Sequence, residues 1–396
     1  MQRRQLMALA VLAAAIAAPA FSQSKEVKIA VIASKTGPLE AYAKQTIVGF
    51  NMGLDYATGG TMMVAGKKLV VIEKDDQGKP DVGKAALAAA YGDDKADIAV
   101  GPTASPVALA MLPVAEEYKK VLLVEPAVAD SITGDKWNKY IFRTGRNSSQ
   151  DAAANAAALD KPGNVIATLA NDNAFGRDGV KAFKEYIKKG KFVHEEYLPA
   201  GTTDFTAGLQ RLVDKMKDQP GRKYVWVVWA GAPSPFSKFA ELELQKRYGI
   251  EMATGGNILP AMVAYKQYPG MEGALYYYFG IPKNKVNEWL VANHYKQFKA
   301  PPDFFTAGGM SAAIAVVEAL KKTNGDASAA KLIPAMEGMS FETPKGKMTF
   351  RKEDHQAMQD MYHFKIKNDP AFAWGVPELV REIKPSEMNV PIRNKR

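Results

Sequence analysis

The sequence predicts an α/β protein made of two doubly wound lobes. Short apolar strands alternate with helices in two successive series, which is the pattern of parallel sheets covered on both faces. The mature chain, at about 370 residues, is too long for one compact core. Because parallel strands direct their carboxyl ends to one edge of each sheet, two such lobes present their loops to a shared cleft.

The first series covers the amino-terminal part of the mature chain. One of its helices shows an apolar face at helical spacing, formed by Val107, Met111, Val114 and Tyr118. We expect strands at residues 28–33, 69–74, 96–100, 121–124 and 140–143, and helices near 42–58, 81–92, 105–119 and 130–137.

The second series begins with the strand Val165–Ala170. Before it, Asn147-Ser148-Ser149 is typical of a helix cap preceding the helix Gln150–Leu159. Two further helices, near 284–299 and 305–322, belong to one lobe or the other, and periodicity does not decide which. Between these regions we expect strands at residues 165–170, 192–198 and 224–229, and helices at about 175–189, from Asp204, and at 235–248.

The first 22 residues have the pattern of a secretory signal peptide. Arg3 and Arg4 precede an apolar run from Leu6 to Ala18, and Ala20-Phe21-Ser22 supplies the small residues of a cleavage site before Gln23. We therefore expect a periplasmic protein. The absence of cysteine excludes a lipid-anchored cysteine, a disulfide and a thiolate metal site. No later stretch is expected to approach the length of a transmembrane helix.

The charge balance is basic but dispersed. The chain has 52 Lys and Arg residues against 42 Asp and Glu, a net charge of +10, and without Arg3 and Arg4 the excess is +8. No basic block occurs, and lysines such as Lys188 and Lys189 stand among acidic residues. We interpret this as a solvated basic surface and expect no nucleic-acid partner.

Enzyme motifs are absent or incomplete. The segment Gly78–Lys84 has P-loop spacing, but Ala85 follows where a hydroxyl should bind Mg²⁺, and Pro80 removes a backbone donor. No Gly-x-Ser-x-Gly elbow occurs. Hence we expect no enzyme, cofactor or metal site. The four histidines also lack metal-ligand spacing: His194, His294, His355 and His363.

The most informative loop is Gly101-Pro102-Thr103-Ala104-Ser105, which follows an apolar strand and opens into a helix. Unpaired backbone N–H groups at such a helix start can bind a carboxylate, with Ser105 as a hydroxyl donor. Alternatively, Ser105 is only the N-cap and Pro106 the first helical residue. The loop alone leaves both interpretations open.

Taken together, the chain resembles the periplasmic solute-binding proteins of the branched-chain, or hydrophobic, amino acid ABC uptake systems. The resemblance extends over nearly the whole mature chain. Each motif is weak alone, but six occur in the family's order. They are Ser34-Lys35-Thr36-Gly37-Pro38 with Tyr42, Asp75-Asp76-Gln77-Gly78-Lys79-Pro80, Val100-Gly101-Pro102 with Ser105, Tyr140-Ile141-Phe142-Arg143-Thr144, Asn171-Asp172-Asn173-Ala174-Phe175-Gly176-Arg177 and Pro199-Ala200-Gly201-Thr202-Thr203-Asp204-Phe205.

This resemblance implies a leucine-binding-protein-like, type I periplasmic binding protein. It implies two flavodoxin-like lobes joined by three hinge crossovers, near residues 144–148, 272–280 and 344–352. Lobe 1 is expected to hold residues 23–145 and about 276–346, and lobe 2 residues 146–275 and about 347–396. It also implies a monomer without enzymatic activity that passes a small-molecule ligand to the membrane permease subunits of an ABC importer.

The resemblance also implies which residues bind the ligand. Tyr42 would form an aromatic wall, and Phe175 stands where the family often has tyrosine. In amino acid binders, a hydroxyl stands at Ala129, and a carboxylate in the loop 230–234 pairs with the ligand ammonium; neither is present here. The expected ligand-binding residues are Tyr42, Thr103, Ala104, Ser105, Ala127, Val128, Ala129, Phe175, Ala230, Gly231 and Tyr276.

An unpaired buried ammonium is costly, so the pattern favours a small hydrophobic carboxylate such as an aromatic acid. Branched-chain amino acids stay open as ligands, because Asp130 or Asp204 could supply the missing charge. Phe175, Trp226 and Trp229 could instead be core residues.

Two other functions stay open as alternatives to import. They are a sensor partner for a membrane receptor and, more remotely, a periplasmic amide or ester hydrolase.

Overall fold

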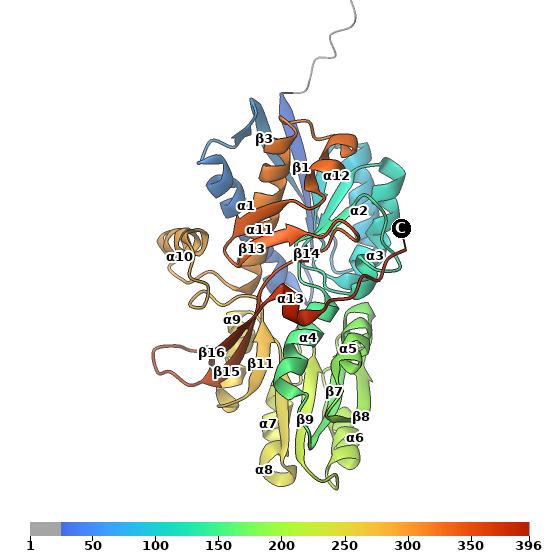
Figure 1. Cartoon of the computed structure of the whole chain (residues 1–396), viewed down its shortest axis with the longest axis vertical. Coiled ribbons are helices and arrows are strands. Elements are labelled where there is room, and N and C mark those ends of the chain that lie inside the picture. The colour runs from blue at the N-terminus through green and yellow to red at the C-terminus, as the bar shows by residue number, and fades with distance from the viewer. Residues whose placement is uncertain (1–24, 396) are drawn as a thin grey trace, which may run out of the picture.

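Figure 1 shows the computed structural model, which describes residues 25–395, as two lobes stacked along the long axis. The expected signal peptide lies outside the described residues. The upper body in this view, which we call the first lobe, contains a six-stranded sheet in the order β2-β3-β1-β4-β5-β6. All its pairings are parallel except β2 with β3. Its strands are β1 (Glu26–Ala33), β2 (Met63–Val64), β3 (Lys67–Asp75), β4 (Ile98–Val100), β5 (Val121–Val124) and β6 (Ile141–Arg143).

The helices of the first lobe come from two distant parts of the chain. The early helices follow the predicted alternation, and the later ones return after the chain has built the other lobe (Figure 1). They are α1 (Glu40–Thr58), α2 (Pro80–Gly92), α3 (Ser105–Tyr118), the 3₁₀ turn η1 (Asp130–Ile132), α10 (Lys285–Phe298), α11 (Phe304–Lys322) and α12 (Ala329–Met336). Helix α10 lies at the side of the lobe (Figure 1), where Trp289 packs on Tyr56 of α1.

The lower body, the second lobe, has a parallel four-stranded sheet in the order β10-β9-β7-β8. The helix expected at 235–248 is two helices, α7 and α8, because Glu243 adopts a left-handed conformation at φ 50°. The elements are α4 (Ser148–Leu159), β7 (Asn164–Asn171), α5 (Ala174–Tyr186), β8 (Lys191–Leu198), α6 (Thr206–Met216), β9 (Arg222–Val228), α7 (Phe236–Glu241), α8 (Leu244–Tyr248), β10 (Ile250–Thr254), α9 (Leu259–Met262) and η2 (Ala264–Gln267).

Two small antiparallel sheets complete the lobes. The sheet with the strand order β11-β15-β16 extends the second lobe, whereas the sheet with the order β12-β13-β14 lies with the first lobe (Figure 1). Periodicity did not predict these short strands. Their bounds, with the last helix, are β11 (Glu272–Leu275), β12 (Ser340–Thr343), β13 (Gly346–Phe350), β14 (Ala357–Met358), β15 (Met361–Lys367), β16 (Val376–Ile383) and α13 (Pro385–Met388).

The chain crosses between the lobes between β6 and α4, after β11, and between β14 and β15 (Figure 1). After α13 it passes back to the first lobe, where Arg351 donates to the Val390 carbonyl. The third crossing differs from the expected 344–352. Residues 347–358 stay with the first lobe because β13 pairs with β12 and because Arg143 at the end of β6 bridges Gln356. The Arg143 backbone N–H also donates to the His355 carbonyl at 3.1 Å. The crossing therefore lies near residues 359–360.

Helix α11 is the centre of the first lobe's core. It is the one helix among residues 25–395 that is long and apolar enough to cross a membrane, which corrects the expectation that no later stretch approaches that length. Most of it is buried inside the protein. It packs against α1 at Gly49 and Gly309, where the backbones approach too closely for a side chain.

Candidate functional site

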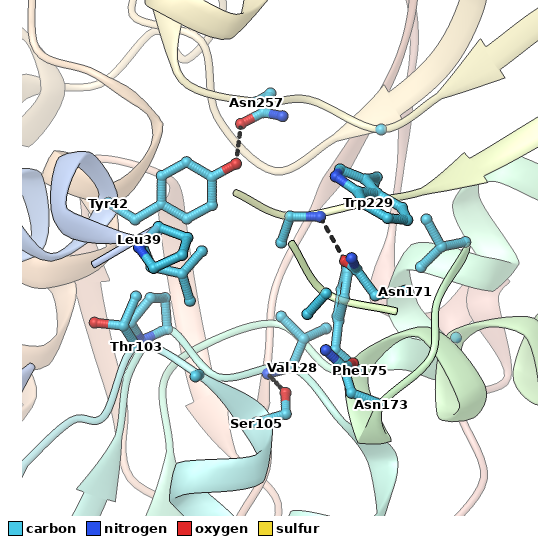
Figure 2. Close-up of a pocket in the computed structure, with 18 of the residues that line it drawn as sticks. Leu39, Tyr42, Thr103, Ser105, Val128, Asn171, Asn173, Phe175, Trp229 and Asn257 are labelled. Atoms are coloured by element: carbon cyan, nitrogen blue, oxygen red, sulfur yellow. Dashed lines mark hydrogen bonds between the residues drawn. The ribbon is translucent and has the colours of Figure 1, made fainter. Parts of the chain in front are cut away.

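A cavity of about 380 Å³ lies between the two lobes, within the range of small-molecule sites. Figure 2 shows side chains from both lobes converging on it, with Tyr42 and Thr103 on one side and Phe175 and Trp229 on the other. Loops at the carboxyl ends of strands build both walls, as the doubly wound architecture requires. Seven of the sequence-predicted residues border it: Tyr42, Thr103, Ala104, Ser105, Val128, Phe175 and Ala230.

The loop after β4 sets the first wall. Gly101 has φ 125°, and a Cβ there would lie 1.9 Å from the Ile32 carbonyl oxygen, so only glycine fits. Ala104 occupies the N-cap position of α3 and Ser105 is its first residue. The N-cap interpretation of Ser105 is therefore wrong: its hydroxyl makes no cap hydrogen bond to the first turn.

The Ser105 hydroxyl is instead an acceptor for a neighbouring loop. Its Oγ accepts hydrogen bonds from the backbone N–H groups of Val128 and Ala129, both at 3.1 Å (Figure 2 shows the loop contact). These two bonds occupy both lone pairs of the oxygen. The hydroxyl can therefore make a further hydrogen bond only by donating its hydrogen. Thr103 is similar, because its Oγ1 accepts from the Ser34 N–H at 3.2 Å.

Two hydroxyl donors thus border the cavity beside a helix N-terminus that no described side chain caps. Helix starts carry partial positive charge and unpaired N–H groups, so such a wall suits an anion. The arrangement can bind a carboxylate without a cationic side chain at this end.

Tyr42 connects the lobes across the cavity. Its hydroxyl donates to Asn257 Oδ1 at 3.0 Å and accepts from the Gly231 N–H at 3.2 Å, and its ring packs on Phe305 at 4.7 Å (Figure 2). Burial raises the pKa of Tyr42, so the phenol stays neutral at physiological pH. Gly231 is therefore engaged with Tyr42 and does not border the cavity.

The second lobe contributes aromatic and amide groups. Trp229 borders the cavity and is also packed, because its Nε1 donates to the Pro233 carbonyl at 2.8 Å and its ring meets Phe205 edge-on. Asn171 Oδ1 accepts from the Ala230 N–H at 2.8 Å, which holds the loop after β9 in place. Asn173 caps α5 by accepting from the Gly176 N–H.

Four expected residues do not border the cavity: Ala127, Ala129, Gly231 and Tyr276. Tyr276 is the clearest correction. It is 1% exposed, and its hydroxyl donates to the Phe304 carbonyl at 2.9 Å. It follows β11 directly and lies in the crossover between the lobes, within the expected hinge segment 272–280.

The two carboxylates considered as ammonium partners also lie elsewhere. Asp130 accepts from the Ser149 N–H and hydroxyl, and Asp204 accepts from the N–H of Thr206, the first residue of α6. Neither borders the cavity.

A buried ion pair that sequence reasoning missed does border the cavity. Arg146 Nε donates to Asp151 Oδ1 at 3.1 Å, and both residues lie at the first crossover. Arg146 stands in the segment expected to hold the first hinge, 144–148, whereas Asp151 lies beyond it in α4. Nothing in the spacing indicated that the two side chains meet inside the cleft.

The acidic residues and histidines are the possible metal ligands of this chain. Among residues 25–395 no cluster of three or more His, Asp or Glu side chains could hold a metal ion. His194, His294 and His363 each have a partner outside the cavity, namely Glu196, the Ala300 carbonyl and Glu272.

Known proteins share this architecture. A family model described as periplasmic binding protein matches residues 26–371. An ABC-type branched-chain amino acid transporter from Rhodopseudomonas palustris CGA009 is 65% identical with a TM-score of 0.83, covering 94% of this chain and 100% of that chain.

Two more distant relatives are described with different ligands. A solute binding protein of an ABC transporter from Rhodopseudomonas palustris BisB5, in complex with 3,4-dihydroxy benzoic acid, is 29% identical with a TM-score of 0.80, covering 91% of this chain and 98% of that chain. Leu/Ile/Val-binding protein homolog 6 of Brucella abortus (strain 2308) is 25% identical over 382 residues, covering 91% of this chain and 92% of the relative. The chain thus belongs to the periplasmic binding protein family, the solute-binding components of ABC transporters, and has their type I fold.

Proposed function

We propose that this protein binds a small aromatic carboxylate between its lobes and delivers it, as a monomer released from its signal peptide, to the permease of an ABC importer. One observation carries the choice of ligand. The cavity joins an uncapped helix start and two hydroxyl donors to the aromatic side chains of Tyr42, Phe175 and Trp229. Aromatic side chains contribute about 0.5–1.5 kcal/mol each to a ring beyond area burial.

The absence of a dedicated ammonium partner supports the same ligand. The loop 230–234 has no carboxylate, and Asp151 is already paired with Arg146. An ammonium placed at Asp151 would lie beside the guanidinium charge, which disfavours it. The relative in complex with 3,4-dihydroxy benzoic acid supports an aromatic acid as well.

Branched-chain amino acids are the second candidate, because of the names of the 65%-identical transporter protein and the Leu/Ile/Val-binding homologue. Both candidates require reversible binding without turnover. A ligand recovered chemically changed after incubation would indicate a hydrolase instead.

A thermal-shift screen of the chain from Gln23 onward separates the candidates. Amino acids, aromatic acids, aliphatic acids and amides would be compared at equal concentration. A ligand at about 100 times its Kd stabilises a protein by roughly 2.7 kcal/mol, which is a readily measured shift in Tm. We expect benzoate-type acids to raise the Tm. Stabilisation by leucine, isoleucine or valine, with none by aromatic acids, would contradict the proposal.

A further inference from the structure

The ion pair of Arg146 and Asp151 borders the cavity at the first crossover between the lobes. Each of the two side chains has a polar atom without a hydrogen-bond partner among the described residues. The guanidinium lies beside a packed pair of rings, 5.1 Å from the Tyr276 centroid and 5.3 Å from the Phe304 centroid. Arg146 is 8% exposed, and its Nη1 has no hydrogen-bond partner among the described residues. A buried, unpaired charged donor is costly, so the guanidinium has hydrogen-bonding capacity to spare. Nη1 itself is closed to solvent, whereas the 9% of the side chain that is exposed borders the cavity, and a ligand oxygen would meet Arg146 there.

Asp151 offers the complementary acceptor. Its Oδ1 accepts from Arg146 Nε, whereas Oδ2 accepts no hydrogen bond from any described residue. Because Asp151 borders the cavity, its 20% exposed side chain faces the space that a ligand would occupy. One end of the cavity therefore presents a donor and an acceptor side by side on residues that compensate each other's charge.

The chemistry of this pair selects one kind of ligand group. A second carboxylate would meet the Asp151 charge, and an ammonium would meet the Arg146 charge. A hydroxyl both accepts and donates, so it matches the two residues together.

We infer that Arg146 and Asp151 recognise a hydroxyl group, and that the ligand is a ring-hydroxylated aromatic carboxylate. This inference rests on the proposed function, because it assumes that the carboxylate binds at the start of α3. Neither residue was expected in the site. Their role is to discriminate hydroxylated from plain aromatic acids.

The test compares benzoate, 3-hydroxybenzoate, 4-hydroxybenzoate and 4-methoxybenzoate by calorimetric titration of the wild-type chain. We expect the better hydroxybenzoate to bind about tenfold more tightly than benzoate, the effect of hydrogen bonds to charged groups. The methoxy compound, which cannot donate, should lose most of that gain. This comparison needs no variant, so it stands even if a substitution prevents folding.

The double variant Arg146→Gln/Asp151→Asn then removes both charges together and leaves no single charge buried. We expect its Kd for benzoate to stay within about threefold of wild type, while the preference for the hydroxybenzoate falls to about one- to threefold. A matched control is Glu125→Gln/Lys345→Met, which removes two opposite charges buried at the same crossover but outside the cavity lining. The control should keep the wild-type preference.

The outcomes distinguish the two proposals. If benzoate binds but the hydroxybenzoates gain nothing, the hydroxyl inference fails and the proposed function stands. Equal loss of benzoate and hydroxybenzoate binding in the double variant would mean that Arg146 holds the carboxylate, which also overturns the inference. A control that loses the preference would show a general hinge effect and overturn it too. If no aromatic acid binds, both proposals fail.

Discussion

Under the proposed function, Ser105 serves both the stability of the fold and the binding of the ligand. Its Oγ accepts two backbone N–H bonds from the loop after β5, and this leaves the hydroxyl hydrogen for a ligand. Sequence spacing placed Ser105 at the helix start but could not distinguish a cap from a contact between loops. The partners are 23 and 24 residues away along the chain, a separation that no local pattern encodes.

Ser105→Ala is expected to weaken carboxylate binding by about 1–3 kcal/mol, because a charge-assisted hydrogen bond is lost in a closed site. It should also lower the Tm, since the N–H groups of Val128 and Ala129 lose their acceptor. Calorimetric titration well below the Tm measures the binding effect. An unchanged Kd with a lowered Tm would show that the hydroxyl serves the fold alone.

Asp303, at the N-cap of α11, predicts a pH dependence of stability. It is 8% exposed, and burial raises its pKa to about 6 although it accepts from the N–H groups of Phe304 and Leu259. The folded chain then holds this proton more tightly than the unfolded chain, whose Asp has a pKa near 3.9. Protonated Asp303 therefore contributes to the free energy of unfolding. This contribution is fully present below about pH 4 and is lost as the pH rises through 6.

Between pH 4 and pH 7 the wild type should therefore lose about 2 kcal/mol of unfolding free energy relative to Asp303→Asn, which cannot titrate. Urea unfolding of both proteins at several pH values gives this difference. A difference that stays constant over the range would mean that Asp303 ionises normally in the folded chain.

At the scale of elements, the contact between α1 and α11 is set by glycine. A Cβ on Gly309 would lie 2.0 Å from the Thr46 carbonyl oxygen, so the two backbones must separate to admit a methyl group. We expect Gly309→Ala to cost about 1–3 kcal/mol of unfolding free energy, the range for overpacked cores. Gly280→Ala is the matched control, since the nearest atom is 3.5 Å away on Tyr278. Equal stability of the two variants in denaturant unfolding would contradict this account.

Most of the first six strands and the helices between them could be predicted, because buried parallel strands and amphipathic helices have distinct periods. The strands β11 to β16 could not be predicted, since they are short and pair across large sequence separations, as β11 does with β15. For the same reason the residues at the crossovers were misplaced. Tyr276 was expected in the cavity and is buried beside it, whereas Arg146 was not expected and borders it.

We expect the whole molecule to close on its ligand. Contacts across the cleft join Tyr42 to Gly231 and join the Ser131 N–H and hydroxyl to Asp178 Oδ2, at 2.9 and 2.8 Å. A ligand that touches both walls adds to these contacts only in the closed form, so binding shifts the population toward closure. Small-angle scattering of the chain should show a smaller radius of gyration with a bound aromatic acid. No compaction at saturation would contradict the hinge mechanism.

The central claim is that the cleft selects an aromatic carboxylate over an amino acid. Its most direct test is calorimetric titration of the chain from Gln23 with 4-hydroxybenzoate and, separately, with leucine. We predict saturable one-to-one binding of 4-hydroxybenzoate and at least tenfold weaker binding of leucine, because the carboxylate that borders the cavity, Asp151, is already paired with Arg146 and an ammonium there would meet the guanidinium charge. Tighter binding of leucine, or no heat with 4-hydroxybenzoate, would contradict it.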